Sequence, residues 1–153
     1  MRTAVFPGSF DPFTKGHEDI VRKSLDLFDQ VIVAIGVNST KRYLFDLEKR
    51  QRWIETVFSQ DQRVKVVTFE GLTVDLCKKE GAQFILRGLR NPADFQYESN
   101  IAHMNAGLNK NIQTVFLLCD PSLAAINASI VREIYKNKGD VSPFIPDAIN
   151  LYE

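Results

Sequence analysis

The chain has 153 residues, the usual length of one domain, so we expect a single domain over 1–153. Its 19 basic residues balance 19 acidic ones, which argues against nucleic acid or an anionic membrane as a partner. There is no apolar run of membrane-spanning length, and a strand begins almost at Met1 with no signal peptide before it, so we expect a cytoplasmic protein. Cys77 and Cys119 stand far apart in apolar segments and are expected to be buried, reduced thiols.

Strand and helix patterns alternate along the whole chain. Strands are predicted at 3–6, 31–37, 64–69, 84–86 and 114–118, and helices at 18–28, 47–58, 73–80, 94–108, 129–137 and onward from Ser142. Asp46 is a good N-cap, Gly81 a good helix end, and Ser142-Pro143 an N-cap followed by a proline at the first helical position. The alternation predicts an α/β, Rossmann-like, doubly wound sheet of five parallel strands with helices on both faces.

The loop after the first strand is the most informative segment. Residues 7–17 read Pro-Gly-Ser-Phe-Asp-Pro-Phe-Thr-Lys-Gly-His and place Gly16 and His17 in the first turn of a helix. Free N–H groups at a helix N-terminus attract phosphate, and Gly8 and Gly16 let it approach the backbone. The spacing is neither that of a P-loop nor that of a dinucleotide fingerprint. The alternative interpretation is a structural turn with a surface histidine.

Polar and cationic residues follow each predicted strand. Because ligands bind beyond the carboxyl ends of such strands, these residues are expected to converge. They are Ser9, His17, Lys41, Arg42, Thr73, Arg87, Arg90 and the segment 120–129. This local excess of cations would suit a triphosphate and a phosphorylated acceptor. Two alternatives stay open: Lys41 and Arg42 could be a solvated loop pair, and Arg87 and Arg90 could merely bond the C-terminal ends of helices or pair with Asp94 or Glu98.

Other candidates have structural interpretations. Phe45, Phe95 and Tyr97 are expected in the core rather than at a nucleotide base, because aromatic side chains more often pack there. Glu98 could lie on the surface of its helix. His103 is expected to be structural, since nothing near it in the sequence indicates a metal or a nucleophile.

Residues 7–17 resemble the G-x-F-D-P-x-x-x-G-H loop of the nucleotidyltransferase superfamily. Segments 7–21, 29–35, 86–98, 102–105, 131–133 and 139–141 are similar to the bacterial phosphopantetheine adenylyltransferase family. The run R-G-L-R…D-F-x-Y-E within 86–98 separates this family from relatives acting on nicotinamide mononucleotide or glycerol phosphate. The resemblance implies that ATP and 4′-phosphopantetheine give dephospho-coenzyme A and pyrophosphate by direct in-line displacement, without a covalent enzyme intermediate.

The resemblance also implies roles for individual residues. His17 would stabilise the pentavalent phosphorus, Lys41 would hold the acceptor and α-phosphate oxygens, and Ser9 would touch both substrates. Arg87 would bind the phosphate of phosphopantetheine and Arg90 the β- and γ-phosphates, so His17, Lys41 and Arg90 are the expected catalytic residues. The remaining contacts would be Thr73 on the pantetheine arm and, around ATP, Phe10, Gly88, Leu89, Glu98, Leu123, Ala124, Ala125, Ile126, Asn127, Ala128 and Ser129.

The family further implies Mg²⁺ arriving with ATP rather than on a side-chain cluster, a homohexamer, and coenzyme A as an inhibitor. One segment departs from the pattern: the usual I-S-S-S or I-S-S-T run reads Ile126-Asn127-Ala128-Ser129, and Leu123 replaces an aromatic residue. Asn127 could still donate through its amide. A nucleotidyltransferase with another acceptor, or a nucleotide-binding regulatory module without catalysis, are the alternatives. The loop 38–46 has a composition that suits a mobile lid.

Overall fold

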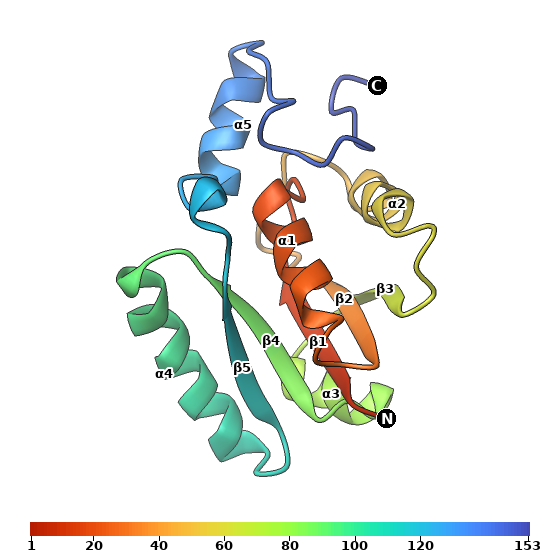
Figure 1. The fold of residues 1–153 in the computed structure, drawn as a ribbon, viewed down its shortest axis with the longest axis vertical. Coiled ribbons are helices and arrows are strands. Elements are labelled where there is room, and N and C mark those ends of the chain that lie inside the picture. Colours follow the sequence, from red (N-terminus) through yellow and green to blue (C-terminus); the bar gives the residue numbers. More distant parts are fainter.

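Five parallel strands form one sheet in the computed structural model, which describes all of residues 1–153 (Figure 1). The strands are β1 (Thr3–Gly8), β2 (Gln30–Gly36), β3 (Val64–Phe69), β4 (Phe84–Leu89) and β5 (Gln113–Leu118). The helices are α1 (Lys15–Ser24), α2 (Leu47–Val57), α3 (Thr73–Glu80), α4 (Pro92–Leu108), the 3-10 turn η1 (Pro121–Leu123) and α5 (Ala128–Lys136). The strand order is β3-β2-β1-β4-β5, so the predicted doubly wound fold is confirmed.

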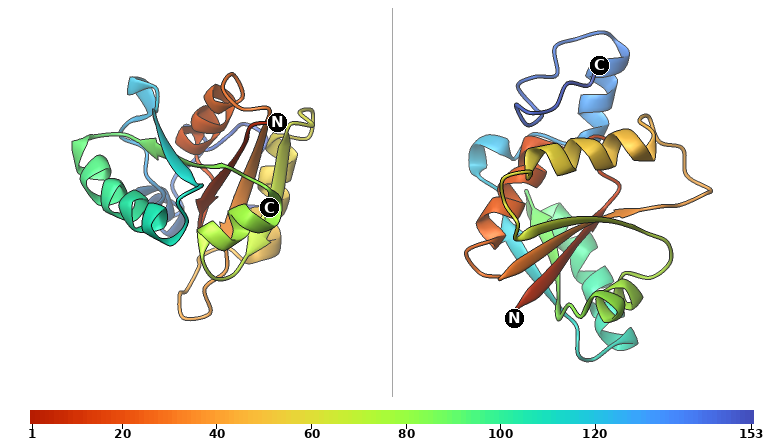
Figure 2. Two further views of the ribbon diagram at one scale, coloured as in Figure 1. Left: turned by 90° about the horizontal axis from the view of Figure 1, so that it is seen from below. Right: turned by 90° about the vertical axis from the view of Figure 1, so that its right-hand side faces the viewer.

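Helices cover both faces of the sheet, and each face has its own apolar core. Alternate residues of β1 point to opposite faces, because side chains alternate along a strand. Ala4 and Phe6 pack with α1, α2, α5 and the C-terminal segment, whereas Val5 packs with α3. Figure 2 shows α3 and α4 on one face, and Figure 1 shows α5 beyond the carboxyl ends of the strands. No helix in the structure is long and apolar enough to cross a membrane.

The sheet opens at its switch point between β1 and β4. β1 pairs with β2 along all of Thr3–Gly8, but it pairs with β4 only at Ala4 and Val5. Beyond Val5 the two strands separate, while β4 stays paired with β5 up to Leu89. The carboxyl ends of β1 and β4 therefore border a gap between the two strands, at the position where doubly wound folds bind ligands. Because β4 stays paired with β5, it extends three residues past its predicted end at Leu86.

The first helix carries Gly16 and His17 in its first turn, as the loop motif predicts. α1 starts at Lys15, three residues before the apolar face predicted from Glu18 onward, because Thr14 and His17 form a capping box. The Thr14 hydroxyl accepts from the His17 N–H (3.3 Å), and His17 accepts from the Thr14 N–H (3.0 Å). The helix ends at Ser24, and Leu27, predicted on its inner face, is 44% exposed.

The predicted C-terminal helix after Ser142 is wrong. The segment forms turns, in which Ser142 donates from its N–H and its hydroxyl to Asp140 Oδ1 (3.0 and 2.7 Å). Pro146 explains the difference. It has no N–H to donate within a helix starting at Pro143, and it disfavours the helical conformation of Ile145.

Three predictions of burial also fail. Phe95 and Tyr97 are 51% and 68% exposed on α4, whereas Phe45 lies in the core as expected. The rest of the chain leaves the outward face of α4 uncovered, so Tyr97 stays exposed and Phe95 is covered only on the side where its ring contacts Phe116 (centroids 5.7 Å apart). Cys77 is buried, but Cys119 is only half-buried because it borders the space at the switch point.

Candidate active site

A cavity of about 340 Å³ lies where β1 and β4 separate. Most of the predicted site residues line it, namely Ser9, Phe10, His17, Lys41, Arg87, Gly88, Leu89, Arg90, Glu98, Ile126, Asn127 and Ala128. Thr73 lies instead in an adjoining hollow of about 240 Å³. Leu123, Ala124, Ala125 and Ser129 line neither space. The structure thus brings together residues from the ends of β1, β2 and β4 and the start of α5.

The His17 imidazole is held in one orientation and one tautomer. A backbone N–H can only donate, so the bond from Thr14 N to His17 Nδ1 makes Nδ1 an acceptor. Burial, followed by the nearby charges of Arg87 and Arg90, lowers the pKa of His17 from 6.5 to about 3. At neutral pH the ring is therefore uncharged and carries its proton on Nε2.

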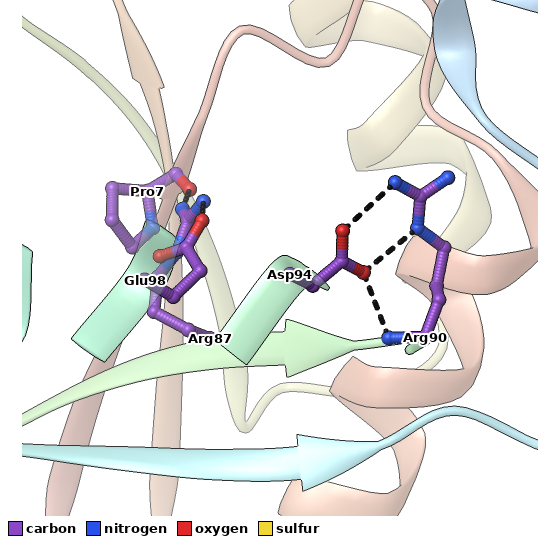
Figure 3. Close-up of polar contacts among 5 residues, drawn as sticks. All are labelled: Pro7, Arg87, Arg90, Asp94 and Glu98. Atoms are coloured by element: carbon purple, nitrogen blue, oxygen red, sulfur yellow. Dashed lines mark hydrogen bonds and ion pairs between the residues drawn. The ribbon is translucent and has the colours of Figure 1, made fainter. Parts of the chain in front are cut away.

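Arg87 is fixed to the wall of the cavity by a carboxylate and a carbonyl. Its Nε and Nη2 donate to Glu98 Oε2 and Oε1 (2.8 and 2.7 Å), and its Nη1 donates to the carbonyl of Pro7 (Figure 3). Glu98 is only 8% exposed, so it does not lie on the surface of α4. Such a forked pair orients the guanidinium more tightly than a lysine could be oriented.

Arg90 is oriented in the same way by the first turn of α4. Its backbone N–H and Nε donate to Asp94 Oδ2 (2.9 and 3.1 Å), and its Nη2 donates to Oδ1 (3.2 Å) (Figure 3). Burial alone would raise the pKa of Asp94, but these bonds and the charge of Arg90 lower it. Arg90 Nη1 also donates to the carbonyl of Ile126 (3.3 Å), which ties β4 to the segment before α5. Both arginines therefore pair with carboxylates of α4, which was the alternative to phosphate binding in the sequence analysis. Both also line the cavity.

Ser9 and Lys41 meet at the mouth of the cavity. Lys41 Nζ donates to Ser9 Oγ (2.9 Å), although 32 residues separate them in the sequence. Behind them, the buried Arg50 donates to the carbonyl of Ser9 (2.7 Å). Asp11 accepts from the N–H groups of Leu44 and Phe45 (2.8 and 2.9 Å). The loop 37–46 is thus tied to the loop after β1, which fixes Lys41 beside Ser9.

Phe10 closes the floor of the cavity in a strained backbone conformation. Its φ is +49°, a region that non-glycine residues rarely adopt. Its ring lies edge-on to the His17 ring, with centroids 5.0 Å apart. A Cβ on Gly8 would come within 2.9 Å of the Phe10 ring, so a larger residue at that position would have to displace the ring.

The start of α5 offers backbone donors to the cavity. Asn127 caps the helix by accepting from the N–H of Ile130 (2.8 Å), so its carbonyl oxygen is engaged. Ala128 is the first helical residue, and its N–H has no acceptor within the helix. Ser129 Oγ accepts instead from Arg132 Nη2 (3.1 Å). The altered Asn127-Ala128 pair therefore preserves a helix N-terminus at the cavity, without a hydroxyl at Ala128.

Several lining residues were missed by the sequence analysis. Asp11, Thr14, Cys119 and Arg132 all border the cavity. Thr14 and Asp11 belong to the loop motif itself, so their positions could have indicated them. Arg132 lies in the segment 131–133 that resembles the family, but it was given no role, because its neighbours in sequence form an ordinary amphipathic helix. His103 is exposed on α4, away from these groups.

Comparison with known proteins shows the family of the chain. Residues 5–134 match the model of the cytidylyltransferase-like family. The chain is 55% identical to the phosphopantetheine adenylyltransferase of Flavobacterium psychrophilum, covering 99% of both chains. It is 52% identical to that of Cytophaga hutchinsonii (95% and 97% covered) and 45% identical to that of Limosilactobacillus reuteri (98% and 87% covered). The chain therefore belongs to the phosphopantetheine adenylyltransferase family of the cytidylyltransferase-like nucleotidyltransferases.

Proposed function

We propose that the protein transfers an adenylyl group from ATP to 4′-phosphopantetheine, giving dephospho-coenzyme A and pyrophosphate. The observation that carries this proposal is the full-length similarity to adenylyltransferases together with the convergence of His17, Lys41, Arg87 and Arg90 on one cavity. The acceptor phosphate attacks the α-phosphorus in line, so the protein positions two anions and stabilises charge without supplying a nucleophile.

His17 is the group proposed to stabilise the transition state. Its neutral ring donates from Nε2 to an oxygen of the α-phosphate, while Thr14 holds Nδ1. Lys41 neutralises the same phosphate and the acceptor, and Ser9 contacts both substrates. A donor aimed at developing charge contributes most when it is held in place beforehand, and the capping box provides that restraint for His17.

Arg87 is proposed to bind the acceptor phosphate. It lines both the main cavity and the adjoining hollow, together with Ser9 and Glu98, so it stands where two substrates would meet. The hollow is proposed to take the pantetheine arm, with Thr73 and Phe69 among its walls.

The main cavity is proposed to take ATP. Arg90 binds the β- and γ-phosphates, and Phe10, Gly88, Leu89 and Glu98 contribute the adjacent wall. The remaining ATP contacts are proposed along the segment before and into α5, at Leu123, Ala124, Ala125, Ile126, Asn127, Ala128 and Ser129. Of these, Ile126, Asn127 and Ala128 line the cavity, so the other four would need a local rearrangement to touch ATP.

The triphosphate is proposed to bring Mg²⁺ as its own counter-ion. No group of three histidine, cysteine, aspartate or glutamate residues is placed to hold a metal. The carboxylates nearest the cavity are engaged already, Glu98 and Asp94 with arginines and Asp11 with backbone N–H groups. Phosphate oxygens would then supply most of the ligands for the ion.

We further propose a homohexamer, inhibition by coenzyme A, and a cytoplasmic location. Self-association would cover the exposed apolar side chains along α4, which are Phe95, Tyr97, Ile101, Met104 and Leu108. Coenzyme A contains the reaction product within its structure, so it would compete for the same cavity. The two unpaired thiols are compatible with a reducing compartment.

Pyrophosphate release from Mg-ATP with purified protein tests the activity. Parallel reactions replace 4′-phosphopantetheine with nicotinamide mononucleotide, or the pair with CTP and glycerol 3-phosphate. Turnover with phosphopantetheine alone is expected, and His17→Ala should reduce it by about a hundredfold or more. His103→Ala is the matched control. Turnover of His17→Ala near the control rate would refute the role of His17, and ATP binding without any turnover would favour a regulatory module.

A further inference from the structure

A second, strongly cationic hollow of about 240 Å³ adjoins the active-site cavity. Its charged walls are Lys41 and Arg42 from the loop after β2, Arg132 and Lys136 from α5, and the single carboxylate of Asp11. Arg132 and Lys136 are four residues apart and so face the same side of their helix. Arg42, Arg132 and Lys136 have no part in the function proposed above.

These four cations have no carboxylate partner. The ion pairs in the structure involve other residues throughout, and both oxygens of Asp11 already accept backbone N–H groups of Leu44 and Phe45. Arg87 and Arg90, in contrast, are each neutralised by a carboxylate of α4. In a chain with 19 basic and 19 acidic residues, four converging unpaired cations form a local positive field that favours an anion.

The hollow is built rather than loosely assembled. The half-buried Arg132 is held by bonds from Nη1 to the carbonyl of Asp11 (2.9 Å) and from Nη2 to Ser129 Oγ (3.1 Å). Lys41 Nζ lies 5.5 Å from the centre of the Tyr43 ring, and the guanidinium of Arg50 lies 4.1 Å from the same ring centre. Cation–π contacts of this kind restrain the lysine side chain.

The hollow and the active-site cavity are continuous. Ser9, Asp11, Lys41 and Arg132 line both, so a molecule bound in the cavity could extend a charged group into the hollow. Lys41 is proposed to neutralise the reacting phosphates, which places the hollow directly beyond them.

We propose that this hollow, lined by Lys41, Arg42, Arg132 and Lys136, is an anion subsite for a phosphate group that does not itself react. The inference rests on the proposed function, since the phosphate belongs to a nucleotide or product already held in the cavity. Two sources share this chemistry: the terminal phosphates of ATP and of the pyrophosphate released, and a phosphate carried on the ribose of a bound nucleotide.

Direct binding tests the subsite independently of turnover. The variant combines Arg42→Ala with Lys136→Ala, two exposed side chains whose loss should leave the fold intact. Lys110→Ala is the matched control, because Lys110 is also exposed and unpaired but lies in the turn between α4 and β5, at the other end of the sheet. Calorimetry then compares pyrophosphate, dephospho-coenzyme A and coenzyme A, the last two differing only by the 3′-phosphate on the ribose.

The double variant is expected to bind one of these ligands about tenfold more weakly, since two partly solvated charge contacts are lost. A loss for pyrophosphate identifies the terminal phosphates as the occupant. A loss for coenzyme A, with dephospho-coenzyme A unchanged, identifies the ribose phosphate. The proposal of a subsite would be overturned if the double variant and the Lys110→Ala control bound all three ligands with equal affinity. It would also be overturned if the wild-type protein bound neither pyrophosphate nor coenzyme A. Neither result would touch the proposed activity, which the turnover of the wild-type protein decides separately.

Discussion

The uncharged imidazole of His17 should make the protein less stable as the pH falls below 6.5. Burial and the charges of Arg87 and Arg90 lower the pKa of His17 from 6.5 to about 3 in the folded protein. In the unfolded chain the ring is free to bind a proton near pH 6.5. Between these values the unfolded state holds one more proton than the folded state. The free energy of unfolding therefore keeps its full value above pH 6.5, and it decreases by about 1.4 kcal/mol per pH unit as the pH falls toward 3.

Urea unfolding from about pH 7 down to about pH 5 measures this loss, which should reach about 2 kcal/mol at the lower pH. The variant His17→Gln should lack that component, while His103→Gln, at an exposed position, should keep it. The chain has only two histidines, so the ring signals of a ¹³C-labelled sample can be assigned from the two variants. A His17 ring that titrates near pH 6.5, or equal pH slopes for wild type and His17→Gln, would refute the proposed environment and the tautomer derived from it.

Three further substitutions test the packing and polar contacts of the site. Arg87→Lys should raise the KM for phosphopantetheine by about tenfold and destabilise the protein by about 1–3 kcal/mol, because a lysine cannot satisfy both oxygens of the buried Glu98; steady-state kinetics and urea unfolding measure the two effects. Gly88→Ala should cost about 1–3 kcal/mol, since its Cβ would come within 2.8 Å of Ile20 Cγ1, and unchanged thermal unfolding would contradict that contact. Thr14→Val should cost about 1 kcal/mol by removing the cap of α1, whereas Thr14→Ser should unfold like the wild type.

Most of the fold follows from local sequence patterns. The continuous apolar run of β2 and the cap at Asp46 each predict their element to within one residue, because both signals act over a few neighbouring positions. The segment after Ser142 shows the limit of such signals. Its start resembles a helix, but Pro146 has no N–H and cannot donate the first helical hydrogen bond.

The candidate site is less completely predictable. Topology alone places residues after β1, β2 and β4 together, so His17, Lys41 and Arg87 could be expected to meet. The sequence could not decide whether Arg87 and Arg90 face the cavity or pair with α4, and the structure has them do both. Which side chains of a segment face a cavity depends on how that segment is rotated against the sheet. For that reason Arg132 was missed, and the sequence could not show that Leu123 borders a different hollow from the other predicted contacts.

The distribution of charge explains how a neutral chain can bind two polyanions. Arg87 and Arg90, which line the cavity, are paired with Glu98 and Asp94, and this keeps each guanidinium oriented without leaving a partly buried charge unpaired. The uncompensated cations lie at the mouth, where solvent reduces the cost of their charge. An incoming phosphate therefore meets the unpaired charges at the mouth first and the carboxylate-paired arginines last. Because attraction at an exposed mouth is screened by salt while forked contacts inside are not, added salt should slow substrate association more than it speeds release.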